Sequence, residues 1–126
     1  MKTIINTSKA PAPIGPYSQA ILYGNTLYTS GQIAINPETG DLVLEDIQSE
    51  TTQVMKNISA VLEAAGMNFS NVIKSSIFIS NMDDFGLINE IYGSYFDDAT
   101  APARETVQVA RLPKNVNVEI SVIAMK

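Results

Sequence analysis

Residues 116–125 have the sequence VNVEISVIAM, in which two kinds of side chain alternate. Successive side chains of a β-strand point to opposite faces, so the pattern predicts a strand with one fully apolar face. The apolar face comprises Val116, Val118, Ile120, Val122 and Ala124. The other face comprises Asn117, Glu119, Ser121, Ile123 and Met125. Such a strand must pack its apolar face against a second layer of structure, and Glu119 is expected outside that core.

Two other segments have the apolar spacing of amphipathic helices. Residues 46–65 place most of their apolar side chains on one stripe: Ile47, Val54, Ile58, Val61, Leu62 and Ala65. Gly66 follows as a C-terminal cap. Residues 83–97 repeat apolar residues at helical spacing: Phe85, Ile88, Tyr92 and Phe96. Pro102 forbids continuation of this second helix.

The remaining segments predict strands. A short strand is expected within residues 2–7, and residues 20–33 predict a hairpin that turns at Gly24-Asn25. Strands are also expected at 72–79, 104–110 and 116–125, which gives the order β-β-β-α-β-α-β-β. No linker or repeat interrupts the chain, so residues 1–126 form one domain. We expect an α+β fold with a mixed sheet and both helices on one face.

The second sheet face is then either solvated or covered by a neighbouring subunit. Tyr28, Ile77 and Ile79 indicate strands that are apolar on both faces, which favours subunits. The low charged content of 17% points the same way.

Composition excludes several kinds of site. The chain has no cysteine and no histidine, which rules out thiol nucleophiles and disfavours a zinc site. Its net charge of −5, with scattered Lys and Arg, argues against nucleic-acid binding. No signal peptide is visible, and no apolar run approaches the ~20 residues that span a bilayer. We therefore expect a soluble cytoplasmic protein.

Two charged residues stand out as candidates for chemistry. Glu119 lies either on a solvated sheet face or in a partly dry crevice between subunits, where desolvation raises its pKa and it could manage water or a proton. Arg104 follows the small residues 101–103, and its guanidinium matches a carboxylate through two parallel hydrogen bonds. The alternative for Arg104 is a structural ion pair with Glu105, Glu119 or an Asp of another subunit.

Four weaker candidates accompany this pair. Ser30 and Gly31 lie in a strand-end turn, where free N–H groups could meet an anion. Tyr17 lies on a proline-stiffened loop and could wall a pocket. Asn89 is expected on the second helix. Each is equally interpreted as a turn or packing residue, and these residues alone do not identify a reaction.

Several stretches together closely resemble the Rid (reactive intermediate deaminase, YjgF-like) family. They are APAPIGPYSQA, LYTSGQIAINPETG, NISAVLEAAG, VIKSSIFISNMDDFGLINEIYGSYF and PARETVQVARLPKNVNVEI. The resemblance covers about residues 2–125 in the family's order, and Arg104 in its P-A-R element indicates the deaminase-active branch.

The resemblance implies a chorismate-mutase-like fold and homotrimers with sites in the clefts between subunits. It implies cofactor-free hydrolysis of 2-imino acids and their enamine tautomers to 2-keto acids and ammonia. The substrates include 2-aminoacrylate, 2-iminopropanoate and 2-iminobutanoate, which are released by pyridoxal-phosphate-dependent serine and threonine dehydratases. No metal or cofactor is implied.

The resemblance also implies roles for the candidates. Arg104 would clamp the substrate carboxylate, and Glu119 would hold or activate the attacking water. Gly31 would contribute backbone contacts, with Ser30 and Tyr17 lining the pocket. Asn89 would lie near that pocket.

One element departs from the family pattern. Many active members have P-A-R-S-C, whereas this chain has Glu105 and Thr106 after Arg104. Thr106 should serve if that position offers only its backbone carbonyl. Strand alternation directs Glu105 away from Arg104, so we expect activity to survive. The competing hypothesis is a non-catalytic, small-carboxylate-binding or regulatory trimer of the same fold. Chorismate mutase activity is disfavoured, because fold does not imply function.

Overall fold

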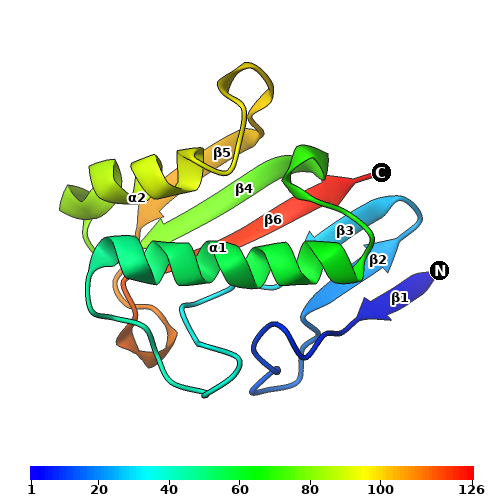
Figure 1. Ribbon diagram of the computed structural model, residues 1–126, viewed down its shortest axis with the longest axis horizontal. Helices are drawn as coiled ribbons and strands as arrows, with labels where there is room; N and C mark the ends of the chain where they lie inside the picture. The colour runs from blue at the N-terminus through cyan, green and yellow to red at the C-terminus, as the bar shows by residue number, and fades with distance from the viewer.

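The computed structural model describes all residues from Met1 to Lys126 as one six-stranded sheet with two helices (Figure 1). The strands are β1 (Lys2–Ile5), β2 (Ala20–Tyr23), β3 (Thr26–Thr29), β4 (Val72–Ile79), β5 (Ala103–Gln108) and β6 (Val118–Met125). The helices are α1 (Ile47–Ala64) and α2 (Phe85–Gly93). This confirms the predicted order of elements and the α+β class.

The sheet order is β1-β2-β3-β6-β4-β5, and every neighbouring pair is antiparallel except β4 and β5. The sheet is therefore mixed, as predicted. The parallel pair is joined through α2, and both helices cover the same face of the sheet (Figure 1). Strand β5 forms one free edge of the sheet and β1 the other.

Helix α1 begins and ends at the residues that its sequence indicates. Asp46 caps its start by accepting a hydrogen bond from the Ser49 N–H at 2.7 Å. At its end Gly66 takes φ +72°, where a side chain would be strained. Its N–H donates to the carbonyl of Glu63, and the next N–H donates to that of Leu62, which satisfies two final carbonyls of the helix.

The core lies between the sheet and the helices. Its β6 contribution is the predicted apolar face, of which Val118, Ile120, Val122 and Ala124 are buried. Helix α1 packs onto it with buried apolar side chains from its second turn onward: Val54, Met55, Ile58, Val61 and Leu62. Burying one such aliphatic side chain stabilises a fold by about 1.5–3 kcal/mol. The apolar face of β6 and the apolar stripe of α1 thus pack together in a single core cluster.

The second helix is shorter than predicted. The apolar spacing suggested residues 83–97, but α2 ends at Gly93, and a 3₁₀ turn, Met82–Asp84, precedes it. Glycine has a low helix propensity, and the Ser94 N–H already splits between two carbonyls of the last turn. Phe96 continues the apolar spacing because its ring packs edge-on against Phe69 at 5.4 Å. The helical spacing of Phe96 therefore reflects a packing contact and does not show that the helix extends to this residue.

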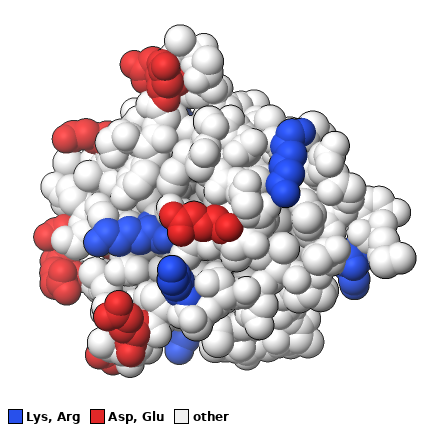
Figure 2. Space-filling view, turned by 45° about the vertical axis from the view of Figure 1, so that its right-hand side comes forward, with Lys and Arg blue, Asp and Glu red and all other residues white.

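The opposite face of the sheet is uncovered. Ile77 and Ile79 of β4 lie beneath the helices, whereas Phe78 between them faces the open side, so this strand is apolar on both faces as expected. Tyr28, in register with Ile123 of β6, is 51% exposed there. Figure 2 shows one side of the surface, where most acidic side chains lie on the left, some of them beside basic ones, and the right half is largely uncharged. Neither α1 nor α2 combines the length and the apolar composition of a membrane-spanning helix.

Candidate active site

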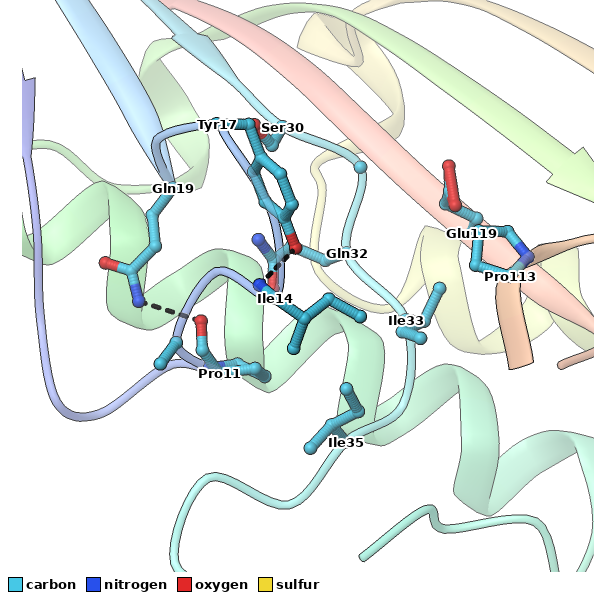
Figure 3. A pocket seen from close by; sticks show the side chains of 12 residues that line it. Pro11, Ile14, Tyr17, Gln19, Ser30, Gln32, Ile33, Ile35, Pro113 and Glu119 are labelled. Carbon is cyan, nitrogen blue, oxygen red and sulfur yellow. Dashed lines mark hydrogen bonds between the residues drawn. The ribbon is translucent and has the colours of Figure 1, made fainter. Parts of the chain in front are cut away.

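A pocket of about 320 Å³ lies beside β6 and extends towards the N-terminal loop (Figure 3). Tyr17 and Ile14 line one side of it, Glu119 and Pro113 line the other, and residues 30–35 run between them. The remaining lining is mainly small or apolar: Pro11, Ala12, Gln19, Ser30, Gly31, Gln32, Ile33 and Ile35. Four sequence-predicted residues therefore share one pocket: Tyr17, Ser30, Gly31 and Glu119.

Glu119 is the acidic group of this pocket. Its neighbours in β6 point into the core, so alternation turns Glu119 to the open face, as predicted. The side chain is half-buried and forms no ion pair. Burial raises the pKa of Glu119 above its usual value, which suits a group that takes up and returns a proton.

Gly31 lies directly against the Glu119 carboxylate. A Cβ at position 31 would stand 2.5 Å from Oε2 and 2.7 Å from Cδ of Glu119. The neighbouring N–H groups of Ser30 and Gln32 donate to the carbonyls of Gln19 and Ile120. The Gly31 N–H donates to no backbone carbonyl, so it is the one donor of this turn that remains for an anion.

Tyr17 and Ser30 are fixed by the loop around them. The Tyr17 hydroxyl accepts a hydrogen bond from the Ile14 N–H at 3.4 Å, which leaves its own hydrogen free to donate (Figure 3). The Ser30 hydroxyl donates to the Ser18 carbonyl at 2.5 Å. Ser30 thus holds the loop to the strand end, and Tyr17 offers the pocket a donor.

Arg104 lies in a different pocket, of about 380 Å³, between α2 and the start of β5. Its Nη1 donates a hydrogen bond to Oδ1 of Asn89. The guanidinium carbon lies 5.5 Å from the Phe85 ring centre and 5.4 Å from that of Tyr92, distances typical of cation–π contacts. Burial raises the pKa of Tyr92, so its hydroxyl stays protonated, and Arg104 forms no ion pair within the chain. Asp98 lines the same pocket without pairing with Arg104.

The two unusual residues after Arg104 have separate environments. Glu105 pairs with Lys74 at 2.8 Å and accepts a hydrogen bond from Ser76, and these two contacts hold its pKa below the usual value. It does not contact Arg104, which agrees with the alternation argument. The Thr106 hydroxyl is buried and has no hydrogen-bond partner.

Arg104 and Glu119 lie on opposite faces of the sheet. Arg104 is in register with Ser75, which is buried beneath α2, whereas Glu119 is in register with Phe78 on the open face. The two pockets share no lining residue. A single chain therefore brings Tyr17, Ser30, Gly31 and Glu119 together in one place, and Asn89 and Arg104 in another. No cluster of three or more acidic side chains that could hold a metal ion is present in either place.

Known proteins resemble this chain over nearly its whole length. The family model described as Endoribonuclease L-PSP matches residues 7–126. A crystal structure of a Yersinia pestis protein of the conserved Rid family has 52% identity and a TM-score of 0.96, and each chain is covered completely.

The chain belongs to the Rid, or YjgF-like, family.

Other Rid relatives are similar over almost their whole length. The mouse 2-iminobutanoate/2-iminopropanoate deaminase is 45% identical over 126 residues, which are 100% of this chain and 93% of the mouse protein. The crystal structure of E. coli TdcF with bound serine is 43% identical with a TM-score of 0.93, and 98% of each chain is covered. The Rid fold of this chain is therefore shared with proteins named as deaminases and with one crystallised with bound serine.

Sequence reasoning missed three buried polar residues around the Glu119 pocket. Gln19 donates to the carbonyls of residues 7, 10 and 11, and Asn57 donates to those of residues 33 and 35. Glu50 accepts three hydrogen bonds from residues 117 and 118. The available signal was spacing, since Glu50 and Asn57 lie two turns apart along the edge of the apolar stripe of α1.

Proposed function

We propose that this protein is a cofactor-free deaminase that hydrolyses small 2-imino acids and their enamine tautomers to 2-keto acids and ammonia. The observation that carries the proposal is Glu119, a half-buried carboxyl group with a raised pKa packed on the bare backbone of Gly31. Relatives named as 2-iminobutanoate/2-iminopropanoate deaminases support it at 45–46% identity. The proposed substrates are 2-aminoacrylate, 2-iminopropanoate and 2-iminobutanoate.

The proposed reaction needs only positioning and proton transfer. The guanidinium of Arg104 holds the substrate carboxylate, and Glu119 accepts a proton as the water oxygen bonds to the imine carbon. The C=N electron pair moves to nitrogen, which takes up a proton and gives a tetrahedral aminol. Protonated Glu119 then returns its proton to the nitrogen, the C–N bond breaks, and ammonia leaves as C=O forms. The hydroxyl proton of the aminol passes to solvent and replaces the solvent proton that the nitrogen took up in the addition step. One water is consumed and no electrons are exchanged.

The proposed site is built from two copies of the chain. Arg104 and Asn89 of one copy would face Tyr17, Ser30, Gly31 and Glu119 of the next. The exposed apolar side chains of the open sheet face, Tyr28 among them, support such packing, and so does the free edge at β5. We propose a homotrimer, as the family resemblance implies; around a threefold axis, each contact between copies would hold one site. The Thr106 hydroxyl, unpartnered in the single chain, lies on β5 near Arg104.

A second candidate is a small-carboxylate-binding or regulatory trimer without turnover. The relative crystallised with bound serine favours it, since serine, like the imino acids, carries a carboxylate with a nitrogen on the neighbouring carbon. The family description as an endoribonuclease has less support here, because the net charge is −5 and histidine is absent.

The test couples the purified protein to a pyridoxal-phosphate-dependent threonine dehydratase, which supplies 2-iminobutanoate. The deaminase proposal predicts faster keto-acid release than dehydratase alone. Calorimetry with 2-ketobutyrate runs in parallel on wild-type protein and Arg104→Ala. Binding that depends on Arg104 without any acceleration would support the regulatory candidate and reject the deaminase.

A further inference from the structure

Glu50, in the first turn of α1, is a carboxylate inside the core. Glu50 is only 1% exposed, and its side chain forms no ion pair. A carboxylate in such surroundings is costly unless its oxygens accept hydrogen bonds. Here Oε2 accepts from the backbone N–H groups of Asn117 at 2.7 Å and Val118 at 3.2 Å, and Oε1 accepts from Nδ2 of Asn117 at 2.8 Å. All three donors belong to the residues immediately before Glu119.

The segment that Glu50 holds needs an anchor. It follows the 3₁₀ turn Pro113–Asn115, in which Lys114 and Asn115 both have left-handed φ angles of 56° and 55°. Non-glycine residues in that region are strained. Beyond Glu119, the backbone of Ile120 is fixed by reciprocal hydrogen bonds with Gln32. Glu119 therefore sits between two anchors, one of which is a side chain from the other layer of the domain.

We infer that Glu50 is a positioning residue for Glu119, acting through the backbone of residues 117 and 118. Holding these two N–H groups fixes where β6 begins, so that position 118 enters the core and position 119 meets Gly31. A displacement of about 1 Å in such a segment can lower a rate as much as a hundredfold, since the reacting groups lose their alignment. This inference rests on the proposed function only where kcat and KM are measured. The titration of Glu119 does not depend on that function.

Two substitutions of Glu50 distinguish the position of its acceptor oxygens from its negative charge. Glu50→Asp keeps both oxygens but withdraws them by about 1.5 Å, one carbon–carbon bond. Glu50→Gln keeps the side-chain length and one acceptor oxygen, which can accept both backbone N–H groups. The NH₂ group of the glutamine would face the side chain of Asn117. The Asn117 amide can rotate by about 180° so that its oxygen accepts a hydrogen bond from that NH₂ group. Val54→Ala, one turn along α1 in the same core, is the matched control, because the valine side chain accepts no hydrogen bond from these donors.

The experiment measures kcat and KM in the coupled assay and, independently, the titration of Glu119 by carboxyl ¹³C NMR without substrate. The Glu119→Gln variant assigns that signal. Tyr17 is the only other titratable residue that lines the pocket. We expect Glu50→Asp to lower kcat about tenfold or more and to shift the Glu119 titration, with KM little changed since Arg104 is untouched. Glu50→Gln and Val54→Ala should stay within about twofold of wild type.

Three results would overturn the inference. The first is a folded Glu50→Asp variant with wild-type kcat and an unmoved Glu119 titration. The second is a loss of activity that follows the loss of thermal stability equally in Glu50→Asp and Val54→Ala. The third is an unfolded Glu50→Asp variant, which would assign Glu50 to the fold as a whole. If the wild-type protein lacks deaminase activity, the proposed function fails, but the NMR titration still decides the role of Glu50.

Discussion

The backbone of Gly31 and the carboxylate of Glu119 are in contact so close that no side chain fits between them. The Cβ of any larger residue would overlap Oε2 at 2.5 Å. Since the end of a glutamate side chain can rotate away, the overlap would move the carboxylate and leave the backbone in place. Gly31 thus sets where the acid of the pocket stands.

Gly31→Ala should therefore damage activity more than stability. The added methyl group displaces the Glu119 carboxylate, and we expect kcat to fall by about tenfold or more. The melting temperature should change by only a few degrees, because position 31 is exposed and the Gly31 φ is not left-handed. Coupled-assay kinetics and thermal unfolding measure the two effects. An active Gly31→Ala variant would show that the carboxylate position is irrelevant.

Glu119→Gln should be inactive and yet at least as stable as wild type at pH 7. Burial raises the pKa of Glu119 in the folded state, so the folded protein binds this proton more tightly than the unfolded chain. Stability from this group is present below the unfolded pKa and lost as pH rises through the raised pKa. Removing the charge should thus raise the free energy of unfolding at pH 7 and not at pH 4, as urea titrations at both values would reveal.

The same substitution tests the proton-transfer role. Losing a general base typically lowers rates about 10²–10⁴-fold, and the wild-type rate should fall as the pH drops through the raised pKa of Glu119. Deamination by Glu119→Gln at near wild-type rates would remove Glu119 from the mechanism.

Thr106→Val should not weaken the fold. The threonine hydroxyl is buried without a partner, and valine has the same shape without that group. Removing an unsatisfied buried hydroxyl stabilises a protein by about 1 kcal/mol. Activity should persist if only the backbone of residue 106 serves the site. A large rise in KM with unchanged stability would instead mean that the hydroxyl binds the ligand.

Local rules predicted most of the fold. Asp46 and Gly66 mark both ends of α1, and alternation along β6 is enough to place Glu119 outside the core. These rules fail where tertiary packing determines the end of an element. Phe96 has helical spacing but lies beyond the end of α2, because its ring packs on Phe69.

The placement of Arg104 and Glu119 on opposite faces of the sheet could not be predicted from the sequence, for a different reason. Which way Arg104 points depends on the register of β5 against β4, a contact between segments about 30 residues apart. The resemblance implied sites in the clefts between subunits, and one chain holds the candidate residues in two pockets on opposite faces of its sheet. Glu50 was overlooked because a carboxylate on the edge of a helix stripe ordinarily faces solvent.

The most direct test of the account mixes two inactive variants. Arg104→Ala and Glu119→Gln are each purified, then unfolded together in equal amounts and refolded, with each variant refolded alone as control. If Arg104 of one copy and Glu119 of the next form each site, about a quarter of the sites regain both residues, and activity returns to about a quarter of wild type. Activity no higher than that of the separate variants, in a mixture shown by mass spectrometry to contain mixed assemblies, would contradict a site shared between copies.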